Sequence, residues 1–221
     1  MSRASVTSGA LAFTAGYVDT VGFITLFGLF TAHVTGNFVL IGSELAHPTD
    51  GVALKLLAFP AFIAAVAASR LLALAVERSG RPTARALLQL QIVLLAACML
   101  CGWQARPITD PGASLVLVTG MLGAAAMGVQ NASSRLAYGD LSPTTVMTGN
   151  VTQLVLAVVD LMRGAADAAS RERIGKLFWP VVAFGCGAIS GALVCQHFAL
   201  WALCLPLAVL SGLALASPSR H

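Results

Sequence analysis

Charged residues are scarce in this 221-residue chain, where lysine, arginine, aspartate and glutamate together make up only 10%. A soluble globular domain carries roughly 25%. Hydrophobic residues account for 57%, and the mean hydropathy is +0.85. A water-soluble fold of this composition would expose too much apolar surface. We therefore expect an integral membrane protein whose principal partner is the lipid bilayer.

Signatures of several function classes are missing as well. The chain contains no G-x-x-x-x-G-K-[ST], H-E-x-x-H or G-x-S-x-G motif, which argues against an ATPase, a zinc protease or a serine hydrolase. Its basic residues form no patch interleaved with aromatics, as a nucleic-acid binder would require. The five cysteines fall inside apolar stretches, where a disulfide framework is not expected. We expect no enzyme, no cofactor or metal, and no nucleic-acid partner.

The apolar residues occur in blocks long enough to cross a bilayer, which takes about 20 helical residues. The blocks cover residues 11–30, 56–76, 86–105, 113–134 and 177–219, and the last accommodates two helices with a turn at Gln196–His197. Two shorter apolar pieces, 38–45 and 141–159, are extra spans, re-entrant segments or second halves of broken helices. Joining each to its neighbour predicts an all-α protein of about six transmembrane helices.

The positions of the basic residues predict an orientation. With six spans, ten of the 13 basic residues lie on one side, Lys55 and Arg106 lie on the other, and Arg135 lies within the membrane. Residues 163–176 form a charged connection on the more basic side. Because basic loop residues mark the cytoplasmic face, both termini are expected in the cytoplasm.

An internal repeat divides the chain into halves. Thr35-Gly36-Asn37 recurs 113 residues later as Thr148-Gly149-Asn150. Thr31 matches Thr144 at the same offset. Upstream, with one residue inserted in the later copy, Gly16 matches Gly128 and Asp19 matches Asn131. We predict a single domain, 1–221, built from repeats at about 10–105 and 113–216. Because three spans is an odd number, the second copy crosses in the opposite sense, as in many secondary transporters.

The segments that carry the repeat also carry a family resemblance. Residues 16–23 and 30–37, then Gln130-Asn131, Arg135 and residues 144–150, resemble the YoaK-like family of small bacterial multi-pass membrane proteins, a domain of unknown function. The resemblance extends over essentially the whole chain. It implies a multi-pass protein of the bacterial cytoplasmic (inner) membrane, but no established substrate.

Ionisable side chains inside the apolar blocks are candidate functional residues, because each costs about 2.5 to 3.5 kcal/mol to insert. Asp19 lies in the middle of the first block, where it could carry a proton or pair with Arg135 of the other repeat. The structural alternative is an ion pair that only holds the two halves together. His33 lies two residues before the first Thr-Gly-Asn segment, where a histidine that titrates near neutral pH suits a proton-linked role. The alternative for His33 is a plain interfacial position.

Each Thr-Gly-Asn segment predicts the start of a half-helix, because threonine and asparagine cap helix N-termini and glycine permits a bend. Two such starts would direct positive dipole ends and N–H groups at a shared midplane site for an anionic or polar solute. Amide packing between helices is the alternative. The expected site residues are Asp19, His33, Thr35, Gly36, Asn37, Gln130, Asn131, Arg135, Thr144, Thr148, Gly149 and Asn150.

These observations favour a small secondary transporter or exporter driven by an ion gradient or by simple facilitation. A channel with the same polar centre is a related possibility. The alternative from another class is a non-transporting membrane scaffold or assembly factor. The sequence leaves the substrate, the coupling ion and homo-oligomerisation open.

Overall fold

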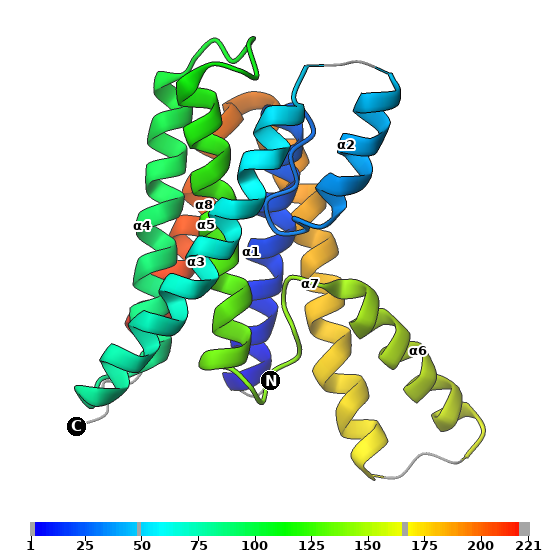
Figure 1. The fold of residues 1–221 in the computed structure, drawn as a ribbon. Helices are drawn as coiled ribbons and strands as arrows, with labels where there is room; N and C mark the ends of the chain where they lie inside the picture. Colours follow the sequence, from blue (N-terminus) through cyan, green and yellow to red (C-terminus); the bar gives the residue numbers. More distant parts are fainter. Residues whose placement is uncertain (1–2, 48–49, 165–167, 217–221) are drawn as a thin grey trace.

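The protein is described from a computed structural model, which covers residues 3–47, 50–164 and 168–216. All regular structure in these ranges is helical (Figure 1). The elements are α1 (Arg3–Thr25), α2 (Gly36–Ala46), α3 (Val52–Arg78), α4 (Thr83–Gln104), α5 (Ser114–Leu136), α6 (Met147–Met162), α7 (Ala168–Phe198), the 3₁₀ helix η1 (Ala199–Leu203) and α8 (Cys204–Ala216).

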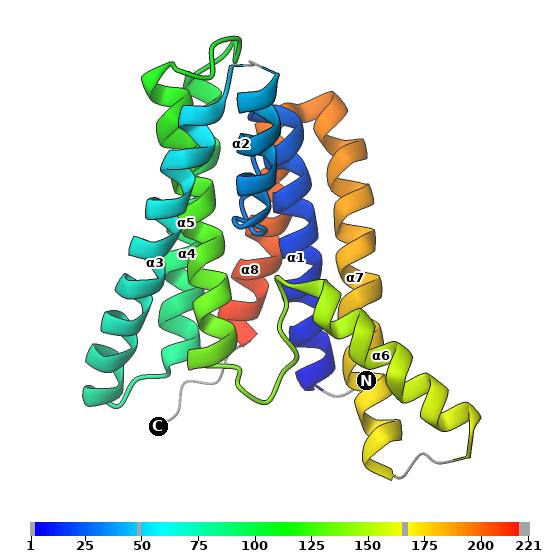
Figure 2. The ribbon, with the colours of Figure 1, turned by 45° about the vertical axis from the view of Figure 1, so that its right-hand side comes forward.

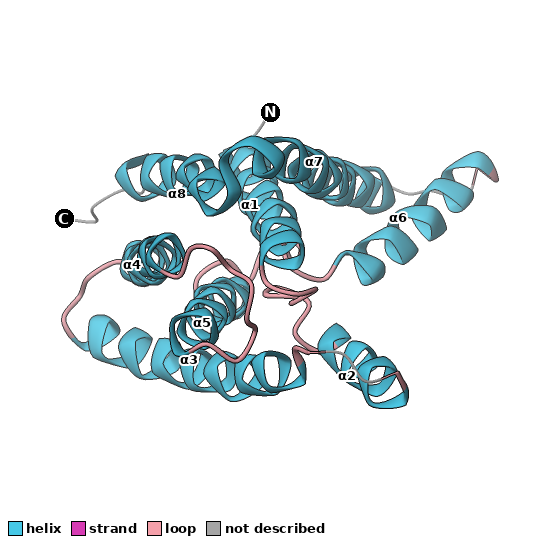
Figure 3. Ribbon diagram, turned by 90° about the horizontal axis from the view of Figure 1, so that it is seen from above, coloured by secondary structure: helices cyan, strands magenta, loops and turns pink. Residues whose placement is uncertain are grey.

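Four helical stretches are long and apolar enough to cross a membrane. They are α3, α4, α5 and the continuous stretch Ser170–Ala216, which contains most of α7 together with η1 and α8. Helix α1 is less apolar, and it packs against α7, α8 and α5 in the middle of the molecule (Figure 3). Its polar residues Ser8, Thr14, Tyr17 and Asp19 are buried in the protein. These helices indicate a bilayer environment and an all-helical membrane protein.

Helices α2 and α6 are half-length elements of 11 and 16 residues. At about 1.5 Å per residue neither spans a hydrocarbon core of about 30 Å. Both begin near the middle of the molecule and run toward opposite ends (Figures 1 and 2). The two short apolar pieces of the sequence are therefore separate half-helices, each preceded by an irregular segment.

Close backbone contacts hold the long helices in two pairs, α1 with α7 and α5 with α3. A Cβ atom on Gly16 would lie 2.2 Å from the carbonyl oxygen of Phe184, and one on Gly187 would lie 2.1 Å from that of Phe13. In the other pair, a Cβ on Gly128 would lie 2.9 Å from the carbonyl oxygen of Phe62. Only glycine permits such close approach, as in many membrane helix pairs.

Two boundaries differ from the sequence-based expectation. Residues 163–176 were expected to connect two spans, but α7 begins at Ala168, and Glu172 and Lys176 pair within its first turns at 2.8 Å. The expected turn at Gln196–His197 is helical. The chain turns instead at η1, where Ala199 adopts a positive φ of 47°.

The first turn of α1 and the last turn of α8 lie at the same end of the bundle (Figure 1), where the Arg3 guanidinium donates to the carbonyl of Ala216. The α3–α4 turn, with Arg78 and Arg81, lies at that end too. Arg135 was expected inside the membrane, but it is exposed in the last turn of α5 and belongs to this basic end.

Candidate functional site

Asp19 is the centre of a buried polar cluster between α1 and the segment that follows it. Its Oδ1 accepts hydrogen bonds from the backbone N–H groups of Thr31 and Ala32, both at 2.7 Å. Its Oδ2 lies 2.7 Å from Nδ1 of His33. The predicted pairing of Asp19 with Arg135 is wrong, because His33 holds this carboxylate and Arg135 lies at the end of α5. Backbone donors stabilise the charged carboxylate where water is excluded.

The imidazole of His33 is the more accessible partner, with 34% of its side-chain surface exposed against 7% for Asp19. The ring stands edge to face with Phe184 of α7, 5.6 Å between centroids, and lies 6.3 Å from Phe30. A cavity of about 480 Å³ opens beside the pair. Its lining residues are Gly16, Asp19, Thr20, Phe23, Phe30, His33, Gly36 and Phe184.

Asn37 closes the irregular segment onto the start of α2. Its Nδ2 donates to the carbonyl of Phe30 at 2.8 Å, and its Oδ1 accepts from the N–H of Phe30 at 2.9 Å. Thr35 was expected to cap the helix, but its side chain makes no cap bond, and backbone carbonyls accept the first N–H groups of α2. The bend expected at Gly36 lies earlier, at Gly28, where φ is +75°.

Gln130 centres a second buried cluster that joins four segments. Its Nε2 donates to the carbonyl of Leu11 in α1 at 2.8 Å and to Thr144 Oγ1 at 3.2 Å. Its Oε1 accepts from Gln91 of α4 at 2.7 Å. The next residue, Asn131, donates to Thr145 Oγ1 at 2.8 Å. These bonds fasten the chain before α6 to the centre of the bundle.

Asn150 closes the second irregular segment in the way that Asn37 closes the first. Its Nδ2 donates to the carbonyl of Pro143 at 2.7 Å, seven residues earlier. Thr148 and Gly149 are exposed within the first turn of α6, which begins at Met147, so Thr148 does not precede the helix as a cap would.

A buried ion pair lies at the end of the bundle opposite the basic one. Lys55, only 1% exposed, donates from Nζ to Glu44 Oε1 and to the carbonyl of Phe27, both at 2.6 Å. The pair ties α2 to α3 and to the turn after α1. The sequence placed Lys55 near the end of a span but did not predict its pairing with Glu44.

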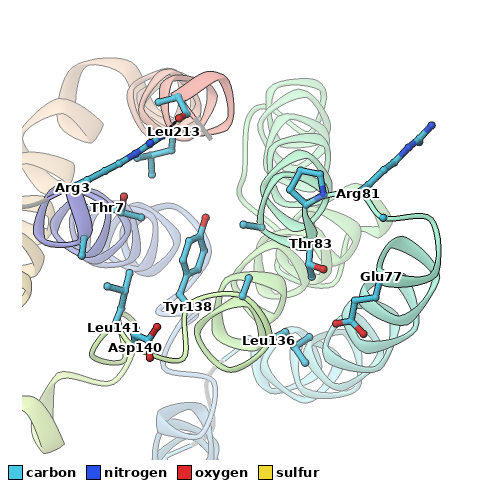
Figure 4. Close-up of a pocket in the computed structure, with 16 residues that line it drawn as sticks. Arg3, Thr7, Glu77, Arg81, Thr83, Leu136, Tyr138, Asp140, Leu141 and Leu213 are labelled. Carbon is cyan, nitrogen blue, oxygen red and sulfur yellow. Dashed lines mark hydrogen bonds between the residues drawn. The ribbon is translucent and has the colours of Figure 1, made fainter. Parts of the chain in front are cut away.

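A second cavity, of about 750 Å³, opens at the basic end (Figure 4). Tyr138 lies in its lining between Arg3 and Leu213 on one side and Glu77 on the other. Burial raises the pKa of Tyr138, so the phenol is neutral at physiological pH. The cavity separates α1 and α8 from the α3–α4 turn, and the Gln91–Gln130 bond joins α4 to α5 deeper in the bundle.

The expected site residues fall into two clusters rather than one pocket. His33 contacts Asp19, Gly36 lines the same cavity, and Asn37 closes the segment that carries His33. Thr144 contacts Gln130, Asn131 holds the adjacent Thr145, and Asn150 closes the segment that carries both threonines. Thr35, Thr148, Gly149 and Arg135 are exposed outside both. Sequence reasoning missed the cavity lining of Thr20, Phe23, Phe30 and Phe184, and also Gln91 and Thr145. Gln91 was detectable as an amide within an apolar block, although Gln89 lies two residues before it.

The fold and these clusters define a polytopic helical membrane protein with two buried polar centres at chain breaks. A family model described as protein of unknown function (DUF1275) matches residues 8–216, so the chain belongs to this family. Comparisons with curated proteins and with solved structures found no match.

Proposed function

We propose that this protein is a small secondary transporter of the bacterial inner membrane that moves a small polar solute past Asp19 and His33. The observation that carries the proposal is a buried carboxylate–imidazole pair beside a cavity of about 480 Å³ at a chain break. Ionisable groups are costly inside a membrane and mark transport paths. Broken helices at mid-depth are typical of solute sites in secondary transporters.

The inverted repeat of this proposal is supported by the packing of the helices. Helix α1 packs on α7 and α8 as α5 packs on α3 and α4, and α2 packs on α3 as α6 packs on α7. Each contact made by a helix of the first repeat, about 10–105, has a counterpart made by the corresponding helix of the second repeat, about 113–216. The paired Asn37 and Asn150 bonds obey the same exchange. On this basis we propose six crossings and two half-helices.

The orientation of the proposal follows from the basic end, which we assign to the cytoplasm. The 750 Å³ cavity at that end then serves as the cytoplasmic vestibule. Asp19 already accepts the backbone donors of Thr31 and Ala32. Because these N–H groups already bind the Asp19 carboxylate, they are not available to an anion. The site therefore favours a neutral or cationic solute over an anionic one.

The test is solute flux into liposomes containing the purified protein. A thermal-shift screen of small metabolites across pH first selects a ligand, since binding raises apparent stability. Saturable flux with counter-exchange, lost in Asp19→Asn and kept in the exposed control Asp160→Asn, is expected. A selected ligand that does not cross, or that crosses equally in Asp19→Asn, contradicts the proposal.

The second candidate is a non-transporting scaffold or assembly factor. One observation favours it: the hydrogen bonds of Asp19 are made to Thr31, Ala32 and His33 of its own chain, as a purely structural role would require. In that case Asp19→Asn alters assembly of the protein and no solute flux exists to be lost. The narrower likeness to the YoaK-like group stays a prediction under either function.

A further inference from the structure

We propose that the cavity beside Asp19 and His33 binds an organic cation in exchange for one proton. This inference names the substrate class of the proposed transport site and so rests on the proposed function. The juxtaposition that carries it is an acid–imidazole pair in a cavity that is also lined by Phe23, Phe30 and Phe184.

The charge of the pair depends on one proton. With His33 neutral, the ionised Asp19 carboxylate leaves the pair with a net charge of −1. With His33 protonated, the two groups form an ion pair of net charge zero across the 2.7 Å contact. A monovalent cation in the cavity neutralises the pair when His33 is neutral. When His33 is protonated, the pair has no net charge for the cation to neutralise. Cation and proton therefore compete, although they bind different atoms.

The walls of the cavity select an organic cation over a hydrated inorganic one. Phe23 and Phe30 pack against each other with ring centroids 4.9 Å apart, and Phe184 of α7 also lines the cavity. Aromatic faces attract cations of low charge density, and recognition of quaternary ammonium groups by aromatic cages is a common use of this interaction. Apart from Asp19 and His33, Thr20 supplies the only polar side chain of the lining. A small metal ion would lack enough oxygen ligands there.

Other titratable groups near the pair do not supply the exchange. Tyr17 on α1, Cys98 on α4 and Cys195 on α7 carry no charge at neutral pH, because thiols and phenols ordinarily titrate well above it. Helix α7 faces His33 with Phe184. The nearest charged groups of α2 and α3, Glu44 and Lys55, neutralise each other at 2.6 Å. From α5, Gly123 faces Thr31. Titration of cation binding is therefore assigned to Asp19 and His33.

The experiment measures binding by equilibrium dialysis, using protein in lipid nanodiscs and empty nanodiscs as the blank. The probe is benzyltrimethylammonium, whose permanent charge ensures that any pH dependence comes from the protein. Benzenesulfonate is the anionic counterpart of similar shape. For wild type, the Kd for benzyltrimethylammonium is expected to fall about tenfold per pH unit as pH rises, then level off once His33 is neutral. Benzenesulfonate is expected not to saturate.

Two amide variants separate the partners. Asp19→Asn keeps an oxygen for the N–H groups of Thr31 and Ala32 but removes the charge, so the affinity for the cation is expected to fall at least about tenfold. His33→Asn keeps a donor toward Asp19 and removes the titration, so binding persists without pH dependence. Asp160→Asn, an exposed carboxylate on α6, should behave as wild type.

Three results would overturn the cation site: no saturable benzyltrimethylammonium binding at any pH, a wild-type Kd independent of pH, or tighter binding of benzenesulfonate. If Asp19→Asn does not fold, the His33→Asn profile decides alone, since pH-dependent binding in that variant also overturns it. Transport is judged separately. Cation binding with proton release but no flux in liposomes leaves this site supported and contradicts the transport function.

Discussion

Asn37 and Asn150 lie 113 residues apart and make the same hydrogen bond, each donating Nδ2 to the carbonyl of the residue seven positions earlier, at 2.8 and 2.7 Å. Each bond closes an irregular segment onto the first turn of a half-helix. The segments differ in one respect. Phe30 also returns its N–H to Asn37 Oδ1, whereas Pro143 has no N–H to return.

This difference predicts unequal costs for two equivalent substitutions. Asn37→Ala removes both partners of the Phe30 peptide group and is expected to cost about 1–3 kcal/mol of unfolding free energy. Asn150→Ala removes one strong bond and should cost less. Thermal unfolding followed by circular dichroism in one detergent measures both. If Asn150→Ala were less stable than Asn37→Ala, the additional hydrogen bond between Phe30 and Asn37 would not determine the difference in stability.

The crossing of α1 and α7 predicts a strong effect of adding one methyl group. In Gly187→Ala the new Cβ would meet the carbonyl oxygen of Phe13 at 2.1 Å, so the helices must separate. Overpacking of this kind costs about 1–3 kcal/mol. Gly185→Ala, on the same helix with nothing within 4 Å, is the control and should be neutral or stabilising. Equal melting temperatures for the two variants would contradict the close crossing.

The buried pair of Lys55 and Glu44 predicts a thermodynamic coupling. Lys55→Met leaves a buried carboxylate without its partner and is expected to cost about 3–5 kcal/mol. Glu44→Gln leaves the ammonium uncompensated. The double variant removes both charges and should cost less than the sum of the single variants, as a double-mutant cycle on unfolding free energies measures. Additive costs would mean that the ion pair does not hold α2 to α3.

The orientation predicts which turns are accessible from outside the cell. With the five native cysteines replaced, a membrane-impermeant maleimide should label Asp110→Cys in intact cells, because the α4–α5 turn lies opposite the basic end. Ser79→Cys, in the α3–α4 turn, should label only after permeabilisation. Labelling of Ser79→Cys in intact cells would reverse the assigned orientation.

Much of the fold was predictable because lipid imposes long apolar helices and places basic residues at their ends. The repeat also located Asp19, Asn37 and Asn150 in the clusters, because a polar residue recurring within apolar blocks has few alternative roles. Arg135 was misplaced because one residue at the end of an uncharged run can lie on either side of a boundary.

The remaining parts of the site depend on tertiary packing. Phe184 contacts His33 only because α7 of the second repeat packs on α1 of the first. No local sequence pattern predicts this packing between the repeats. Threonine capping was expected from propensity, but backbone carbonyls satisfy the first N–H groups of α2, which leaves Thr35 without a capping role.

We propose that α2 and α6 begin at mid-depth in the membrane and run toward opposite faces, and spin-label depth measurements in nanodiscs test this arrangement. Labels on Thr35→Cys and Thr148→Cys, both exposed positions at the starts of the half-helices, should collide with oxygen far more than with an aqueous nickel chelate. Labels on Leu45→Cys and Met162→Cys, at the far ends, should lie near opposite headgroup regions. Start labels at headgroup depth, or far ends on one face, would contradict the account.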